Sequence, residues 1–293
     1  MKILFVSNSH NQISETFIRN KIIGLSARGC DVEILTHEQN TLQNDGSMLN
    51  YKIIYSPVTY SKLFLFFYLT MNIISLVKLF YKQKNVSFGR KLKTSIKSIP
   101  MDKKYDIIYF TFSSIAIQYI PILEHINSKI VFSCRGTAEK VIPFLDENRQ
   151  PQLKELGEIA DLIHCVSNEM SIQIQKFGIN KEKCFINKPS IDTDFFSRSN
   201  DKNFHSDPDK IVISTVARLH WIKDFYFCIN FIKTLREKSI NAFYNIIGDG
   251  EELLKLKFLV NSLELEGYVK FYGFSDPIGV KNILKITDLY LMA

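Results

Sequence analysis

Residues 211–223 read IVISTVARLHWIK, and they decide the fold because a strand-like apolar run leads directly into a loop containing Arg218 and Lys223. In the next strand-like run, residues 243–252 read FYNIIGDGEE and end in a glycine-bearing turn. Neighbouring parallel strands of an open α/β sheet end at the same edge, and that edge holds the ligand. We therefore expect Arg218 and Lys223 to lie near the turn at 248–250.

The chemistry of these residues suits a diphosphate group. The guanidinium of Arg218 is a planar fork of donors and the ammonium of Lys223 is a compact charge. Gly248 and Gly250 allow a backbone to approach a ligand closely. We interpret Arg218 and Lys223 as catalytic residues that stabilise a leaving group, and Gly248, Asp249 and Gly250 as binding residues. An ordinary strand–helix unit with two surface cations is the alternative that either motif alone leaves open.

Length and composition set the class of protein. The 293 residues suffice for two domains, and 46% hydrophobic with 23% charged residues is typical of a globular chain. The five cysteines are scattered without a CxxC spacing, which argues against a disulfide framework and a zinc site. The first residues indicate a strand instead of a signal peptide, so we expect a cytoplasmic protein.

Basic residues are concentrated in residues 46–101, which hold nine Lys and Arg and no Asp or Glu. The net charge of the whole chain is +7, so the remainder carries −2. Residues 63–80 read LFLFFYLTMNIISLVKLF, short of the ~20 clean apolar residues of a transmembrane helix. One interpretation is a long, mostly buried helix over 63–82 followed by a solvated basic helix over 90–98. The other is a peripheral membrane surface facing anionic head groups. No recognition motif indicates nucleic-acid binding.

Strand-like and helix-like segments alternate along the chain, which predicts parallel sheets covered by helices. A polar stretch predicts a linker at 201–210, between a first domain over 1–200 and a second over 211–293. The expected strands are 3–6, 32–36, 53–55, 106–110, 130–133, 162–166, 183–186, 211–216, 243–247, 269–272 and 289–292. The other expected helices are 15–28, 115–126, 152–160, 168–177, 225–238, 251–263 and 279–286.

These features resemble the retaining nucleotide-sugar glycosyltransferases of family four, which have two Rossmann-like domains in the GT-B arrangement. In that family, an Arg and a Lys five residues apart follow the first strand of the second domain and hold the donor diphosphate, and Arg218 and Lys223 have this spacing. The turn at 248–250 matches the Gly-(Asp/Ser)-Gly turn near the donor. Residues 187–196, NKPSIDTDFF, resemble the crossover between the domains. The resemblance implies a nucleoside diphosphate sugar as donor, a glycan or lipid-linked acceptor, and no metal or other cofactor.

The same resemblance implies roles for three further residues. Ser14 and Glu15, in ISETFI, resemble a subgroup that makes bacterial surface polysaccharides; they can bind acceptor hydroxyls or cap the following helix. Arg135 stands where relatives carry a His-Gly or Arg-Gly pair facing the donor sugar. It can contact phosphate or a hydroxyl but cannot shuttle protons, and a surface arginine is the alternative. We interpret His164, on an apolar strand, as a hydrogen-bonded core histidine in preference to a ligand or base.

Residues 286–293 resemble the strand that, in the family, leads into a donor-site loop with two glutamates seven residues apart. The sequence stops before such a loop, so we expect the second domain to be incomplete. Three hypotheses stay open: a glycosyltransferase present as a fragment, an inactive remnant that binds membrane or a partner transferase through 46–101, and a dinucleotide-dependent oxidoreductase. The last ranks lowest, because no GxGxxG follows the first strand.

Overall fold

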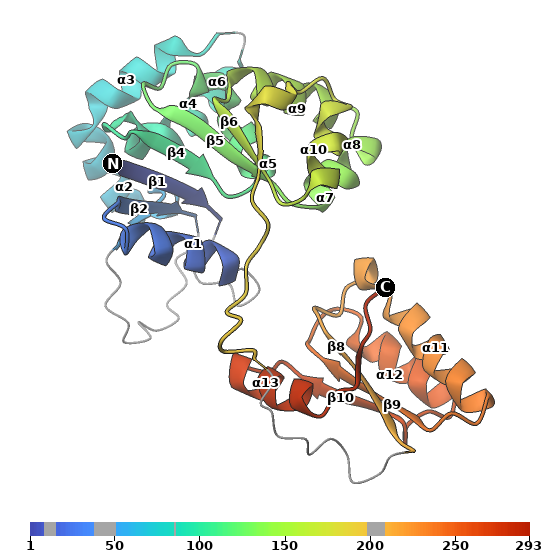
Figure 1. Cartoon of the computed structure of the whole chain (residues 1–293). Helices are drawn as coiled ribbons and strands as arrows, with labels where there is room; N and C mark the ends of the chain where they lie inside the picture. The colour runs from blue at the N-terminus through green and yellow to red at the C-terminus, as the bar shows by residue number, and fades with distance from the viewer. Residues whose placement is uncertain (9–15, 38–50, 85, 198–208) are drawn as a thin grey trace. The chain divides into compact units, whose positions relative to one another are not determined.

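The computed structural model describes residues 1–8, 16–37, 51–84, 86–197 and 209–293. The chain divides into two compact units, Met1–Ser190 and Ile191–Ala293, called unit 1 and unit 2 below. Each unit has its own parallel sheet, which confirms the expected α/β class with two Rossmann-like sheets (Figure 1). Most of the linker that we predicted, 201–208, lies outside the described residues.

Unit 1 is built on a seven-stranded sheet of order β3-β2-β1-β4-β5-β6-β7 in which every pairing is parallel. The strands are β1 (Lys2–Ser7), β2 (Asp31–Thr36), β3 (Tyr51–Tyr55), β4 (Ile107–Phe110), β5 (Lys129–Cys134), β6 (Leu162–Cys165) and β7 (Cys184–Ile186). All seven match the expected segments within a few residues. The inner strands are buried on both faces and read as mostly apolar runs, whereas the edge strands β3 and β7 are only partly buried.

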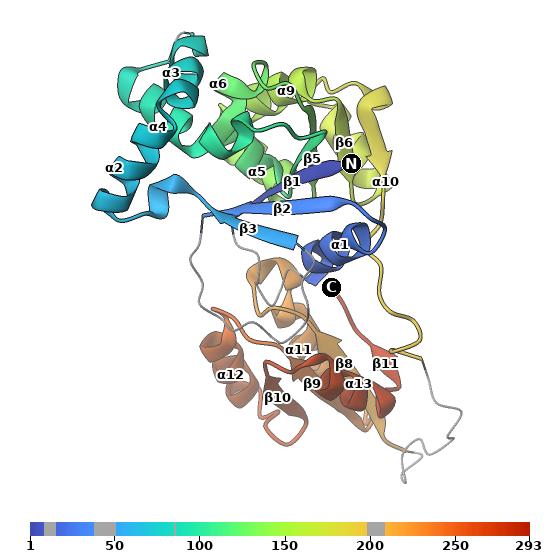
Figure 2. The same ribbon diagram turned by 90° about the vertical axis from the view of Figure 1, so that its left-hand side faces the viewer.

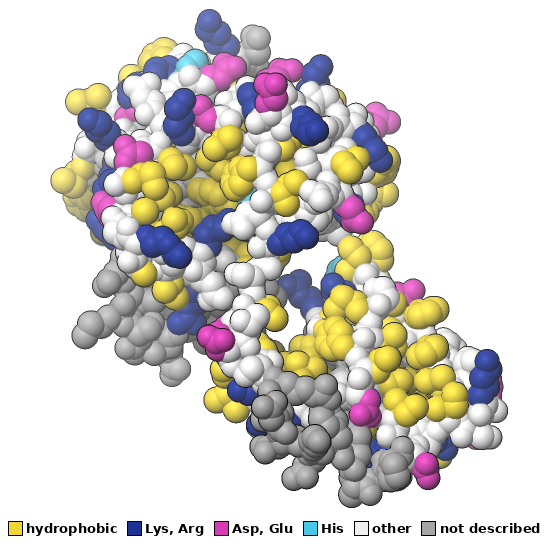
Figure 3. Space-filling view, in the orientation of Figure 1, with side chains coloured by type: hydrophobic (Ala, Val, Ile, Leu, Met, Phe, Trp, Pro, Cys, Tyr) yellow, Lys and Arg dark blue, Asp and Glu magenta, His cyan; other side chains and the backbone are white. Residues whose placement is uncertain are grey.

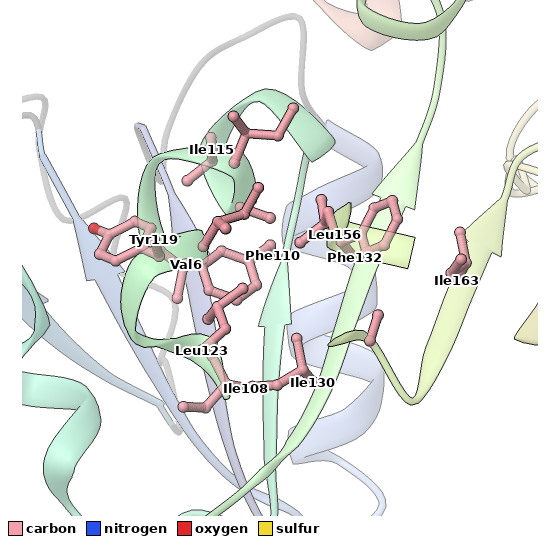
Figure 4. Packing of buried hydrophobic residues seen from close by; sticks show 14 of the residues in the cluster. Val6, Ile108, Phe110, Ile115, Tyr119, Leu123, Ile130, Phe132, Leu156 and Ile163 are labelled. Atoms are coloured by element: carbon pink, nitrogen blue, oxygen red, sulfur yellow. The ribbon is translucent and has the colours of Figure 1, made fainter. Parts of the chain in front are cut away.

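Alternating side chains of these strands form two hydrophobic cores. Leu4 of β1 belongs to the larger core and Phe5 to a smaller one on the opposite face, as the two-residue period of a strand requires. Phe110 and Phe132, both fully buried, lie at the centre of the larger core (Figure 4). Each buried side chain of this size contributes about 1.5–3 kcal/mol relative to the exposed state. The smaller core also includes Ile18 and Ile22, which lie in the helix that follows β1.

Helices cover the two faces unequally. Helix α1 (Thr16–Ser26) lies on one face, and α4, α5, α6 and α9 lie on the other (Figure 2). The helices of unit 1 after α1 are α2 (Lys62–Met71), α3 (Ile73–Lys82), α4 (Phe88–Ser98), α5 (Ser113–Ala116), α6 (Ile120–Leu123), α7 (Thr137–Lys140), α8 (Ile142–Leu145), α9 (Arg149–Ile159) and α10 (Asn168–Gln175). The short helices α7 and α8 were not predicted, since four residues are too few to show a helical period.

The expected single helix over 63–82 is wrong. The chain breaks at Asn72 into α2 and α3, which bend by 83° relative to each other. Asn72 ends α2, and its side-chain amide donates to the carbonyl of Tyr68 at 2.8 Å. The expectation of a mostly buried helix also fails, because α2 has no buried residue and α3 buries only Leu79. Among the described residues, no single helix is long and apolar enough to cross a membrane.

Unit 2 has a four-stranded parallel sheet of order β10-β9-β8-β11. Its strands are β8 (Ile211–Val216), β9 (Ala242–Ile247), β10 (Val269–Gly273) and β11 (Leu289–Tyr290), and its helices are α11 (Phe225–Glu237), α12 (Leu253–Ser262) and α13 (Pro277–Lys285). Helices α11 and α12 contact each other on one face, and α13 lies on the other (Figure 1). This arrangement leaves the carboxyl ends of β8 and β9 at one edge, where the loops of interest begin.

Candidate functional site

Two loops of unit 2 are joined at the carboxyl edge of its sheet. Strands β8 and β9 pair in register to their last residues, so both loops start at the same level. The amide of Leu219 donates to the carbonyl of Asp249 at 2.9 Å, and the amide of Glu252 donates to the carbonyl of Leu219 at 3.2 Å. These backbone bonds hold the loop that carries Arg218 directly against the turn at 248–250. The structure thus brings together the two motifs that the sequence predicted to meet.

The glycines of the turn make this close packing possible. A Cβ atom on Gly248 would lie 1.9 Å from the carbonyl oxygen of Ala217, and one on Gly250 would lie 2.3 Å from that of Leu219. Gly248 also has a φ of 141°, which L-residues rarely adopt. We predicted that these glycines admit a ligand. The contacts that require glycine in the structure are with the chain itself, and they position the Arg218 loop; ligand binding at these glycines stays a prediction.

Lys223 lies at the other end of the same loop, at the start of a helix. It closes the short 3-10 helix η6 (Trp221–Lys223) and is half-buried, whereas Arg218 is exposed. Asp224 follows with a left-handed φ of 38°, and its carboxylate accepts from the amide of Phe227 at 3.1 Å. Helix α11 begins at Phe225, two residues after Lys223, with Asp224 as its N-cap. The positive end of the helix dipole adds to the two cations, a combination that favours an anion.

Asp249 lies at the exposed tip of the turn. Its carboxylate accepts from the amide of Gly250 at 2.7 Å, which stabilises the turn locally. Nearby, His220 Nε2 and Glu251 Oε1 lie 3.6 Å apart, so the first part of the Arg218 loop also contacts the segment after the turn. These contacts fix the two loops as one rigid edge of unit 2.

Arg135 belongs to unit 1, where a buried carboxylate shapes its loop. Glu139, in α7, is fully buried and accepts from the amides of Arg135 at 3.0 Å and Gly136 at 3.1 Å. The hydroxyl of Ser113 donates to the same carboxyl group. Burial raises the pKa of Glu139, and these hydrogen bonds act in the opposite direction. The guanidinium itself donates from Nε to the carbonyl of Thr111 at 3.2 Å, so Arg135 is held in place and is not a free surface arginine.

A network of polar side chains lies beneath Arg135, on the α1 face of the sheet. Tyr109, Ser133 and His164 come from the adjacent strands β4, β5 and β6 and share this face. Both hydroxyl oxygens lie 2.8 Å from His164 Nδ1, and Lys21 Nζ of α1 donates to Tyr109 Oη at 2.8 Å. The face that carries the smaller core is therefore polar at this end of the sheet.

The partners of His164 fix its protonation state. Its Nε2 lies 2.8 Å from the carbonyl oxygen of Asn187, which can only accept, so the proton is assigned to Nε2 and Nδ1 is an acceptor. Burial, together with the nearby charges of Lys21 and Arg135, lowers the pKa of His164 to about 4, although the hydrogen bond to Asn187 acts in the opposite direction. Burial also lowers the pKa of Lys21 to about 8, with a further contribution from Arg135. His164 is neutral near pH 7 and hydrogen-bonded at both nitrogens, as we interpreted it from the sequence.

Lys21, Arg135 and His164 line a hollow of about 400 Å³ between α1 and the segment 187–190. Four of the side chains that line it are cationic: Lys21, Arg28, Arg135 and Lys188. None of its described lining residues is Asp or Glu. A wall of this charge favours phosphate or other electron-rich oxygen groups. It does not provide a general base, because His164 already uses both ring nitrogens.

Several of these residues escaped the sequence reasoning. Lys21 and Glu139 lie in no motif, and Tyr109 and Ser133 stand in otherwise apolar runs. A polar residue within an otherwise apolar strand, such as His164, was the one sequence signal for this network. The sequence does not show which of these polar side chains contact one another. Two predicted residues, Ser14 and Glu15, lie outside the described residues. In the part of the chain that the structure describes, no cluster of three His, Cys, Asp or Glu side chains is placed to hold a metal ion.

Family models match nearly the whole chain. Residues 14–195 match Glycosyltransferase Family 4, and residues 197–293 match Glycosyl transferases group 1. A protein of Escherichia coli K12, provisionally named colanic acid biosynthesis glycosyltransferase WcaL, is 28% identical over 142 residues. This alignment covers 48% of the present chain and 34% of the relative, so it spans about a third of the relative's length.

Solved structures share the fold. HepE of Anabaena, in complex with UDP and glucose, superposes with a TM-score of 0.68 at 14% identity and covers 99% of this chain and 73% of HepE. WaaG, a glycosyltransferase involved in lipopolysaccharide biosynthesis, superposes with a TM-score of 0.65 at 14% identity and covers 99% of this chain and 74% of WaaG. At these identities the likeness shows the fold alone.

Proposed function

Because the chain belongs to glycosyltransferase family 4, we propose that it serves the transfer of a sugar from a nucleoside diphosphate sugar to a glycan or lipid-linked acceptor. The product is a bacterial surface polysaccharide such as lipopolysaccharide, capsule or exopolysaccharide. The names of WcaL and WaaG support this product class, and the UDP bound to HepE supports the donor class. An oxidoreductase is disfavoured, because both family models describe glycosyl transferases.

One observation carries the proposal: Arg218 and Lys223 lie on a loop that is fastened to the turn at 248–250 and ends at the first residue of α11. A diphosphate placed here would meet two cations and the positive end of a helix. These groups would stabilise the negative charge that develops as the sugar–phosphate bond breaks. We propose that they do so without a resident metal ion.

Arg135 has a separate role in this proposal. Its guanidinium is fixed by Thr111 and stacks on Phe17, with Cζ 4.1 Å from the ring centroid. In that position it offers donors to a phosphate or a sugar hydroxyl at the cationic hollow of unit 1. Ser14 and Glu15 stay predictions for the acceptor side. We place the reaction in the cytoplasm, at the inner face of the cell membrane, with residues 46–101 as the peripheral membrane contact.

The test is the affinity of the protein for UDP, measured by isothermal titration calorimetry. Replacing Arg218 or Lys223 by Ala should weaken binding by about tenfold or more, since a hydrogen bond to a charged group contributes about 1.5–3 kcal/mol. Lys257→Ala, which removes an exposed lysine of α12, is the matched control and should leave the affinity unchanged. Equal affinity in all four proteins would refute the leaving-group role.

The alternative is a non-catalytic protein that binds membrane or a partner transferase through residues 46–101. The exposed apolar side chains of α2 favour some contact of this kind. It differs from the first proposal in one measurable way. A binding-only protein would show no detectable affinity for UDP while its membrane or partner contact persists.

A further inference from the structure

Helices α2 and α3, joined at Asn72, expose most of their large apolar side chains; we call this element the α2–α3 corner. Met71 is 86% exposed and Ile74 is 82% exposed, although folding normally buries methionine and isoleucine side chains. The other large apolar side chains exposed here are Leu63, Phe64, Phe66, Phe67, Ile73, Val77 and Tyr81. Large apolar side chains exposed in such number on two consecutive short helices mark an interaction site.

The inner side of the α2–α3 corner is fixed to unit 1. Tyr60 packs edge-to-face against the half-buried Tyr68, with ring centroids 5.4 Å apart. Leu79 of α3 is buried, and Lys82 Nζ donates to the carbonyl of His125 at 3.2 Å. The corner therefore has ordered contacts on one side. Its outward apolar residues form a preformed surface.

Exposed basic side chains lie on α2, on the segment after α3 and on α4, which packs against α3. Lys62, Lys84, Arg90 and Lys93 are all exposed, and the segment 46–101 contains no acidic residue. Figure 3 shows hydrophobic, basic and some acidic side chains at the edge of unit 1 that α2 and α3 form, and Lys78 of α3 pairs with Asp102. An apolar centre with a cationic border is complementary to a bilayer whose lipids have anionic head groups.

The dimensions decide how such a contact can be made. Each helix has ten residues, or about 15 Å, which is half the ~30 Å thickness of the hydrocarbon core. The bend of 83° prevents the two from acting as one straight span. The apolar side chains can therefore reach only the boundary between head groups and acyl chains.

Other occupants fit less well. A second copy of the chain would bring two segments with nine basic and no acidic residues into contact, and their like charges would repel. Nucleic acid would satisfy the cations but would leave the apolar centre facing phosphates and water. A bilayer satisfies both parts of the surface at once.

We propose that the α2–α3 corner docks on a membrane rich in anionic lipid, with its apolar side chains at the acyl boundary and the cations of α2 and α4 against the head groups. This proposal specifies the surface and the lipid class of the membrane contact that the proposed function includes. It rests on the proposed function only for the choice of the cytoplasmic leaflet. The docking does not involve Arg218, Lys223 or any other residue of unit 2.

The test is flotation of the whole chain with two kinds of vesicle, one of pure phosphatidylcholine and one with roughly a third phosphatidylglycerol. We expect at least about tenfold stronger binding to the anionic vesicles, and strong weakening at high salt. The combined variant Phe66→Gln, Met71→Gln and Ile74→Gln should lower binding by about tenfold or more. None of these three residues is buried, so thermal unfolding should stay unchanged and report intact folding.

Phe258→Gln is the matched control, because Phe258 is an apolar residue of α12 that is 74% exposed. It should bind vesicles like the parent protein. Equal binding to both vesicle types, no binding to either, or an equal loss in the control would each overturn the proposal. So would a dimer in size-exclusion chromatography that the combined variant dissociates. UDP affinity, measured on the same samples, separates the two proposals, since a defect in UDP binding alone counts only against the donor site.

Discussion

Gly248 packs directly against the backbone of Ala217, so closely that a Cβ atom on Gly248 would lie 1.9 Å from the Ala217 carbonyl oxygen. The amide of Ala217 in turn donates to the carbonyl of Ile247 at 3.0 Å. The turn at 248–250 and the Arg218 loop thus form one packed element. Gly248 thereby helps to determine where the Arg218 loop lies.

Gly248→Ala should therefore destabilise the protein and weaken its affinity for UDP together. The side chain cannot be accommodated without moving the backbone, and the φ of 141° is unfavourable for alanine. We expect a loss of about 2–4 kcal/mol in the free energy of unfolding, measured by urea denaturation. Gly267→Ala is the matched control, since a Cβ there meets nothing within 4 Å, and it should change stability by less than about 0.5 kcal/mol.

Arg218→Lys should bind UDP with an affinity between those of the parent protein and Arg218→Ala. The ammonium keeps the charge but lacks the planar fork that pairs with two phosphate oxygens. Calorimetry at two salt concentrations would show the difference. If Arg218→Lys binds UDP as tightly as the parent protein, the positive charge alone accounts for the role of Arg218. If it binds as weakly as Arg218→Ala, the planar geometry of the guanidinium alone accounts for it.

Removal of metal ions should leave UDP affinity unchanged, because the proposed site neutralises the diphosphate with Arg218, Lys223 and the start of α11. Titrations with EDTA and with added Mg²⁺ should agree within about twofold. A loss of affinity in EDTA that Mg²⁺ restores would show that the two cations do not suffice.

His164 should make the protein less stable in acid. Its pKa is about 4 in the fold, below the ordinary 6.5, so the unfolded chain binds the proton more tightly than the folded chain does. Its contribution to stability is complete above pH 6.5 and is lost as the pH falls towards 4. His164→Gln lacks this titration. As the pH falls from 6.5 towards 4, the parent protein should therefore lose more unfolding free energy than His164→Gln does. A constant difference between the two proteins over this range would contradict the lowered pKa of His164.

Glu139 should be essential for the shape of the Arg135 loop. Glu139→Ala leaves two amides and the hydroxyl of Ser113 without their acceptor, and we expect about 2–3 kcal/mol of destabilisation. Glu139→Gln keeps one carbonyl acceptor and should lose less. Lys140→Ala changes an exposed neighbour and should have little effect, which chemical denaturation of the three variants would show.

The sequence predicted every strand of both sheets. Runs such as IVISTV at 211–216 are mostly apolar or β-branched, because helices cover both faces of a parallel strand. The prediction of one long helix over 63–82 was wrong because it also relied on apolar content. Apolar content hid the break at Asn72, whose side chain bonds back to Tyr68 and ends α2 there.

The sequence by itself determined the alternation of strands and helices, and hence the edge at which Arg218 and the turn at 248–250 meet, because these depend on local pattern. Only the tertiary structure showed that Lys21 and His164, 143 residues apart, line one cationic hollow with Arg135. Which polar side chains meet across a sheet depends on strand order and register, and these are set by packing over the whole chain. Only the tertiary structure also showed that α2 is exposed, because an apolar run has the same sequence pattern whether it faces a core or water.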